Sequence, residues 1–168
     1  RERNMDRGAI YWAKSDGSSI KEVIQPFMTP NGIGLSPDEK ILYVAETEGG
    51  KLYSYRIIGE GQVEKIAFPK STNGGLLLNK EGGIKKFDSL ALESNGNICV
   101  ATLVDGGISV ISPDGELVEF VKFEDPFITN ICFGSHDLKT AYITASYDGL
   151  LLEVKWDREG LPLNFLNK

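Results

Sequence analysis

The sequence is poor in metal-binding side chains, with one histidine and two cysteines in 168 residues and no CxxC pair. The usual zinc centres need four closely spaced Cys or His ligands, so this composition excludes them. No apolar run approaches the roughly 20 residues that a membrane-spanning helix requires. Lysine and arginine are scattered and the net charge is −6, whereas nucleic-acid binding needs clustered basic residues. We therefore expect neither a nucleic-acid nor a membrane partner.

The N-terminal residues 1–6 are charged and no apolar segment follows them. This pattern is unlike a secretory signal, so we expect no signal peptide and a cytoplasmic protein. Cys99 and Cys132 each lie in an apolar, strand-like run. Cysteines in such runs are usually small buried hydrophobic residues, and we expect that of both rather than a disulfide.

The apolar segments are short and are separated by turn residues, with 19 glycines in the chain. Alternating, β-branched and aromatic residues bounded by such turns predict β-strands, and the Asp16-Gly17 pair predicts a hairpin. Residues 69–87 read as irregular, and no segment predicts an amphipathic helix. The predicted strands are residues 9–14, 20–25, 32–36, 41–46, 52–57, 63–68, 89–93, 98–102, 108–111, 117–123, 129–133, 141–145, 150–156 and 161–165.

An internal repeat groups these strands in fours. Each group begins with an apolar strand, passes a short polar turn and continues into a second strand; the matching segments are residues 33–45, 90–101 and 131–144. Equivalent positions lie about 40–57 residues apart, which is the period of propeller blades. A β-sandwich would also give many short strands, but the repeat makes it the weaker alternative.

Counting the strands predicts an all-β, partial β-propeller of about three and a half four-stranded blades. Residues 9–25 supply only the last two strands of a blade, and three complete blades follow. A propeller needs at least four blades to close its ring. We therefore expect residues 1–168 to be a single domain that is truncated at its N-terminus.

A polar residue precedes the first strand of each complete blade: Asn31, Asp88 and the pair Thr129-Asn130. The first strands of propeller blades line the central channel, so these side chains are expected to meet at one mouth. Carboxylate and amide oxygens suit a hard cation such as Ca²⁺, and such a site can polarise an ester carbonyl. Alternatively, Asn and Asp at strand entrances are simply turn residues that bond backbone amides.

Together these segments resemble the gluconolactonase/regucalcin (senescence marker protein) family over nearly the whole chain, as its C-terminal portion. The Asn-Gly and Phe-Asp motifs are the most specific of them. The segments that carry the resemblance are residues 30–38, 42–47, 87–92, 96–101, 129–134 and 156–165.

The resemblance implies a six-bladed propeller that hydrolyses sugar lactones with a divalent metal ion, most often Ca²⁺, with Zn²⁺ or Mg²⁺ as alternatives. It implies that Asn31 and Asp88 are metal ligands and that Asp88 also positions or deprotonates the attacking water. The family's third ligand, a Glu, and its substrate-binding Arg and Asn would lie before Arg1. The 168 residues alone are therefore expected to be inactive.

Other residues are weaker candidates. His136 stands between Ser135 and Asp137, but adjacency in sequence is not the geometry of a catalytic triad. Glu46 is expected in a turn or at the rim, and Ser36 in a turn. The aromatic residues expected to pack between blades are Tyr11, Trp12, Tyr43, Phe133 and Trp156. Two other functions stay open, a non-catalytic calcium- or ligand-binding propeller and a related esterase that cleaves organophosphates or lactones.

Overall fold

The computed structural model describes residues 7–80 and 83–164, which contain fourteen β-strands and no helix. The all-β expectation is confirmed for this part of the chain. Since it holds no helix, no described segment is a long apolar helix that could cross a membrane. The charged N-terminal residues 1–6 and the last residue of the strand expected at 161–165 lie outside the described residues.

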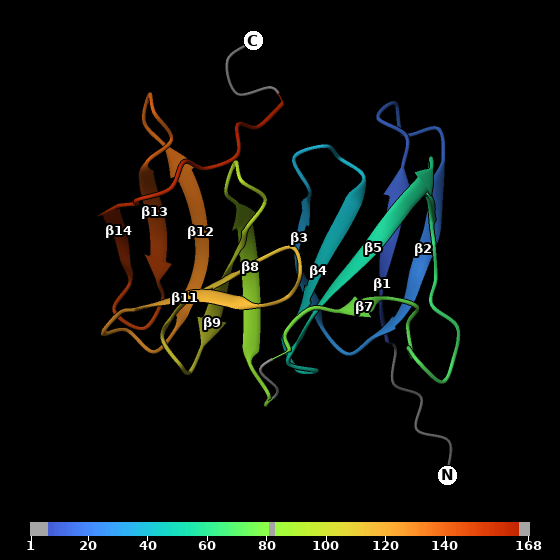
Figure 1. The fold of residues 1–168 in the computed structure, drawn as a ribbon, viewed down its shortest axis with the longest axis horizontal. Helices are drawn as coiled ribbons and strands as arrows, with labels where there is room; N and C mark the ends of the chain where they lie inside the picture. The colour runs from blue at the N-terminus through green and yellow to red at the C-terminus, as the bar shows by residue number, and fades with distance from the viewer. Residues whose placement is uncertain (1–6, 81–82, 165–168) are drawn as a thin grey trace.

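The strands form four sheets that follow one another along the chain (Figure 1). Every pairing is antiparallel and joins strands that are close in sequence, as turns at glycine and Asx residues dictate. The sheets are β1 (Gly8–Ala13) and β2 (Ile20–Phe27); β3 (Pro30–Leu35), β4 (Ile41–Glu46), β5 (Lys51–Gly59), β6 (Gln62–Val63) and β7 (Leu76–Leu77); β8 (Lys86–Leu92), β9 (Ile98–Leu103), β10 (Gly107–Ile111) and β11 (Leu117–Lys122); and β12 (Ile128–Gly134), β13 (Thr140–Ala145) and β14 (Leu150–Lys155).

The polar turns between first and second strands are built alike, which confirms the repeat at the level of hydrogen bonds. After β3, the Ser36 hydroxyl donates to Asp38 at 2.7 Å, and after β12 the Ser135 hydroxyl donates to Asp137 at 2.6 Å. In both turns the aspartate also accepts the amide two residues later, as Asx turns do.

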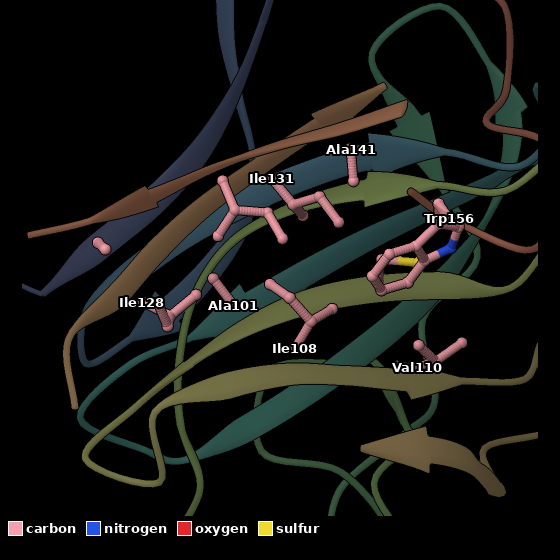
Figure 2. Close-up of a cluster of buried hydrophobic side chains, with 10 residues drawn as sticks. Ala101, Ile108, Val110, Ile128, Ile131, Ala141 and Trp156 are labelled. Atoms are coloured by element: carbon pink, nitrogen blue, oxygen red, sulfur yellow. The ribbon is translucent and has the colours of Figure 1, made fainter. Parts of the chain in front are cut away.

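The hydrophobic core lies between neighbouring sheets, because each sheet buries the face that meets the next. Figure 2 shows the cluster between the third and fourth sheets, where Ile108 and Val110 face Ile131 and the Trp156 ring. The side chains of this cluster are almost completely buried, and each contributes about 1.5–3 kcal/mol when it is a large aliphatic residue. This packing holds the first strands β3, β8 and β12 next to one another (Figure 1).

Two of the predicted strands are wrong. Of the strand expected at 63–68 only Val63 is in a strand, and Phe68 is exposed. The chain instead returns to β5 through β7, which lies inside the segment expected to be irregular. The segment 161–164 is not a strand: Gly160 bridges to Glu93 and the amide of Leu161 bonds to Leu92, so the chain crosses the end of β8 instead of pairing with β14. Among the described residues the fourth sheet therefore has three strands, not the expected four.

Three burial expectations need correction. Tyr11 is exposed, because its face of the β1–β2 sheet has no neighbouring sheet in the described chain, and its hydroxyl donates to Glu22. Trp12 is only half-buried, against Gly61. Cys132 is exposed whereas Cys99 is buried, and both thiols are free, so the absence of a disulfide is confirmed.

Candidate functional site

The three first strands share one irregularity at the positions that the sequence singled out. Each carries one residue more than its partner strand over the same stretch, a β-bulge. Bulges redirect side chains and are frequent next to active sites. The paired residues that flank the extra residue are Pro30 and Ile33 on β3, Phe87 and Leu90 on β8, and Ile128 and Asn130 on β12.

Asn31 and Asp88 lie at two of these bulges, and the structure brings them together. The Asn31 amide lies close enough to the Asp88 carboxylate to lower its pKa. The strands approach so closely that a Cβ atom added to Gly32 would lie 2.5 Å from the backbone oxygen of Asp88. A residue with a side chain would push β3 away from β8, so glycine is required here for the two polar groups to meet.

The environment of Asp88 favours a cation. Burial raises the pKa of the Asp88 carboxyl, and the hydrogen bonds from Asn31 and the Ser89 amide only partly offset this effect. No ion pair of the described residues includes Asp88. A half-buried carboxylate without a positively charged partner would be stabilised by a bound cation.

Thr47, the residue after β4, connects the Asn31 side chain to the backbone next to Asp88. Asn31 donates from Nδ2 to the Thr47 hydroxyl at 3.3 Å. That hydroxyl in turn donates to the carbonyl oxygen of Phe87 at 2.6 Å, directly before Asp88. From the sequence, Thr47 was included only in the segment 42–47, and the separation of 40 residues from Phe87 left no local signal for this contact.

The third bulge supplies hydroxyl groups and an amide. Thr129 Oγ1 lies 2.8 Å from both the Thr144 and the Ser146 hydroxyl oxygens. The Asn130 side chain is exposed, and its Oδ1 accepts the amide of Ile131 at 2.8 Å. These groups are weaker ligands than a carboxylate, so the pair Asn31 and Asp88 is the stronger half of the site.

The donor set fits a hard cation but is incomplete. One carboxylate and one amide, with nearby hydroxyls, are oxygen donors of the kind that Ca²⁺ takes. A group of three or more His, Cys, Asp or Glu side chains able to hold a metal is absent from residues 7–80 and 83–164. Zn²⁺ prefers nitrogen and sulfur, which this part of the molecule does not offer.

The remaining candidates lie outside the site. His136 is exposed in the turn after β12, where Ser135 bonds to Asp137 and not to the histidine. Glu46 is buried, and its carboxylate accepts the backbone amide of Met28, which holds the loop that leads to Asn31. Glu46 is thus a structural residue of the rim.

A groove of about 710 Å³ runs along the inner face of the three first strands, and neither Asn31 nor Asp88 lines it. Its walls are mainly apolar, and it ends under the segment 161–164. The exposed Cys132 belongs to this wall. Asn130 of the third bulge also lines the groove, so the groove reaches the polar mouth on that side.

Sequence reasoning also missed the function of Glu93, which is completely buried after β8. Its carboxylate accepts hydrogen bonds from Trp156, Arg158 and Asn97. Two of these donors follow β14, so Glu93 joins the third and fourth sheets. The signal in the sequence that could have revealed this function was a glutamate at the end of an apolar strand.

The chain is similar to known proteins in both sequence and structure. Residues 1–147 match the family model described as SMP-30/gluconolactonase/LRE-like region. A 6-deoxy-6-sulfogluconolactonase of Pseudomonas putida is 30% identical over 119 residues, which are 71% of this chain and 38% of that protein. The diisopropyl-fluorophosphatase of Loligo vulgaris is 31% identical over 162 residues, which are 91% of this chain and 48% of that protein.

The solved structure of a calcium-binding protein, regucalcin, from Agrobacterium tumefaciens superposes with a TM-score of 0.70 at 19% identity. It covers 94% of this chain, while the chain covers 58% of it. At this identity the likeness shows the fold alone. The chain spans about half the length of the two sequence relatives or less.

Proposed function

Because this chain belongs to the SMP-30/gluconolactonase/LRE-like family, we propose that it forms part of a metal-dependent enzyme that hydrolyses sugar lactones. Relatives named as lactonases support the reaction at the level of the family. The observation that carries the proposal for this chain is the meeting of Asn31 and Asp88 at bulges of adjacent inner strands. A turn function would explain each residue separately but not their contact across 57 residues of sequence.

Asn31, through its Oδ1, and Asp88, through its carboxylate, would hold a divalent cation. The chemistry that such a cation supplies is polarisation of the lactone carbonyl and stabilisation of the charge that develops on its oxygen. The oxygen donors favour Ca²⁺, with Mg²⁺ next and Zn²⁺ last.

Asp88 would also act as the general base. Its carboxylate would accept a proton from the water that attacks the carbonyl carbon. The ring C–O bond then breaks, and the proton passes from Asp88 to the ring oxygen, which becomes the hydroxyl of the open hydroxy acid. Burial raises the pKa of Asp88 in the metal-free protein, whereas a bound cation would lower it, so Asp88 would be a weak base that mainly positions the water.

The activity is proposed for a protein longer than these 168 residues. The lactonase and phosphatase relatives are more than twice as long as the parts that match, and one carboxylate with one amide binds Ca²⁺ weakly. We propose that the chain is the C-terminal part of a six-bladed propeller, that a further carboxylate ligand and the substrate-binding residues come from outside it, and that residues 1–168 alone do not turn over lactone.

The test is lactone hydrolysis by the full-length protein, with and without a chelator, compared with the variants Asp88→Ala and Asp114→Ala. Asp114 is an exposed turn residue and serves as a matched control for loss of one carboxylate. Chelation and Asp88→Ala should each abolish turnover, and Asp114→Ala should keep it. Turnover that survives both chelation and Asp88→Ala contradicts the proposal.

A phosphoester or phosphofluoridate substrate is the second candidate, favoured by the diisopropyl-fluorophosphatase that matches 91% of the chain. Parallel assays with a sugar lactone and diisopropyl fluorophosphate separate the two. Calcium binding in calorimetry without turnover of either substrate would instead indicate a non-catalytic binding protein.

A further inference from the structure

The Thr47 hydroxyl has one proton, and the structure shows where it goes. Oγ1 lies 2.6 Å from the Phe87 carbonyl oxygen, which can only accept, so the proton is committed to that bond. The oxygen of Thr47 is then available only as an acceptor on its other side, where Asn31 lies at 3.3 Å. Only the NH₂ end of the Asn31 amide can face it.

This arrangement determines which end of Asn31 is available to a cation. The amide has a donor end and an acceptor end, and only the acceptor binds metal. With its NH₂ group turned to Thr47, Asn31 keeps Oδ1 free of partners among the described residues. We infer that Thr47 is a positioning residue that fixes the amide orientation of Asn31 and so presents Oδ1, together with Asp88, to a divalent cation. This inference rests on the proposed metal site.

The same hydroxyl also fixes the backbone that carries the second ligand. Phe87 immediately precedes Asp88, and its side chain is buried in the core. The bond from Thr47 therefore joins the end of β4 to the start of the bulge on β8. Both ligands are held by one group that need not touch the cation.

The repeat supports an orienting role. Leu103 and Ser146 occupy the position of Thr47 in the next two sheets, as the strand pairings show. Ser146 Oγ lies 2.8 Å from Thr129 Oγ1, so a hydroxyl again meets the bulge residue. Leu103 stands in the sheet whose bulge residue is Asp88, and leucine has no hydroxyl. The carboxylate of Asp88 has two equivalent oxygens, so it does not need a hydroxyl to select one end.

The first test measures Ca²⁺ affinity by calorimetry in Thr47→Val and Thr47→Ser. Valine keeps the shape of threonine but has no hydroxyl, and partners that orient a metal ligand are typically worth about 10–100-fold in metal affinity. We expect Thr47→Val to weaken Ca²⁺ binding by about 10-fold or more, and Thr47→Ser, which keeps the hydroxyl, to bind as the wild type.

The same substitution in an Asn31→Asp background separates orientation from general loosening of the structure. The carboxylate introduced by Asn31→Asp has two equivalent oxygens, so Thr47→Val should no longer reduce Ca²⁺ affinity there. If Thr47→Val reduces Ca²⁺ affinity equally with Asn31 and with Asn31→Asp, its effect is merely structural and the inference is overturned.

An NMR measurement on the metal-free protein does not depend on the proposed function. The side-chain NH₂ protons of Asn31 should exchange slowly with solvent in the wild type and in Thr47→Ser, and faster in Thr47→Val. If the wild type binds no Ca²⁺, the proposed function fails while this readout still decides the role of Thr47. Unchanged exchange in Thr47→Val contradicts it.

Discussion

Replacement of Glu93 by glutamine removes the charge that joins the third and fourth sheets. The Glu93 side chain is completely buried, and it accepts bonds from Trp156 Nε1 at 2.8 Å, Arg158 Nε at 2.7 Å and Asn97 Nδ2 at 2.8 Å. Glutamine has nearly the same volume, but one of its ends is a donor facing other donors. The variant therefore tests the charge and its hydrogen bonds, and not the packing.

The size of the effect follows from burial. Burial by itself would raise the pKa of Glu93, but the bonds from Trp156, Arg158 and Asn97 outweigh it and hold the pKa below its usual value. Breaking a buried ion pair typically costs about 3–5 kcal/mol. Arg158 is partly exposed and keeps a second partner, Glu119, so we take the lower end, about 3 kcal/mol. For a chain of this size that corresponds to a fall in Tm of roughly 6–12 °C.

Thermal unfolding at several pH values measures this effect and its origin. Since the pKa of Glu93 is lowered in the folded state, its stabilisation is present above the pKa of an unfolded glutamate. This stabilisation is lost as the pH falls through the pKa that Glu93 has in the folded protein. The wild type and Glu93→Gln should therefore differ fully at pH 7, and the difference should shrink at pH values below about 4.

Glu119→Gln is the matched control, because Glu119 bonds the outer end of the same arginine at 2.8 Å on the exposed rim. Exposed ion pairs contribute about 0–1 kcal/mol. Equal losses of stability in Glu93→Gln and Glu119→Gln would show that the buried charge of Glu93 is not what stabilises the protein. A loss of stability in Glu93→Gln that is the same at pH 7 and pH 3 would show the same.

Three further outcomes are expected. Gly32→Ala should cost about 1–3 kcal/mol of stability and weaken Ca²⁺ binding, because its Cβ would meet the backbone oxygen of Asp88. In the control Gly34→Ala the added Cβ meets only leucine side-chain tips, which can move, so this variant should bind Ca²⁺ as the wild type does. Equal Ca²⁺ affinity of the wild type, Gly32→Ala and Gly34→Ala in calorimetry contradicts the expected effect of Gly32→Ala. Ca²⁺ at 100 times its Kd should stabilise the wild type by about 2.7 kcal/mol in thermal unfolding and leave Asp88→Ala unchanged, and a shift in both would place the site elsewhere. With a thiol reagent, Cys132 should react in the native protein and Cys99 only after unfolding, so two fast thiols would contradict the burial assigned to Cys99.

The repeat in the sequence was sufficient to predict the first strands β3, β8 and β12, and to place Asn31 and Asp88 at equivalent positions of adjacent strands. It could not predict the bulges, because an extra residue in a strand leaves the composition of the strand unchanged. The bulge before Ile131 shifts the alternation of β12, and Cys132 lies exposed in the groove although its run is apolar. Strand register depends on the partner strand, which local pattern does not specify.

Long-range contacts explain the other differences. The segment after Val63 has β-forming residues, yet β7 takes the position beside β5, because Gly75 lets the chain pass within contact of the Tyr55 ring. The bond from Thr47 to Phe87 spans 40 residues and that from Trp156 to Glu93 spans 63. Such pairs are set by the packing of sheets, and no spacing rule along the chain reveals them.

We propose that Asn31 and Asp88 form the metal-binding half of a lactone-hydrolysing site. The decisive measurement is lactone hydrolysis by the full-length protein, followed with and without chelator in the wild type and in Asp88→Ala. We expect turnover that chelator abolishes, that added Ca²⁺ restores and that Asp88→Ala lacks. Turnover that continues in the presence of chelator and in Asp88→Ala would contradict it.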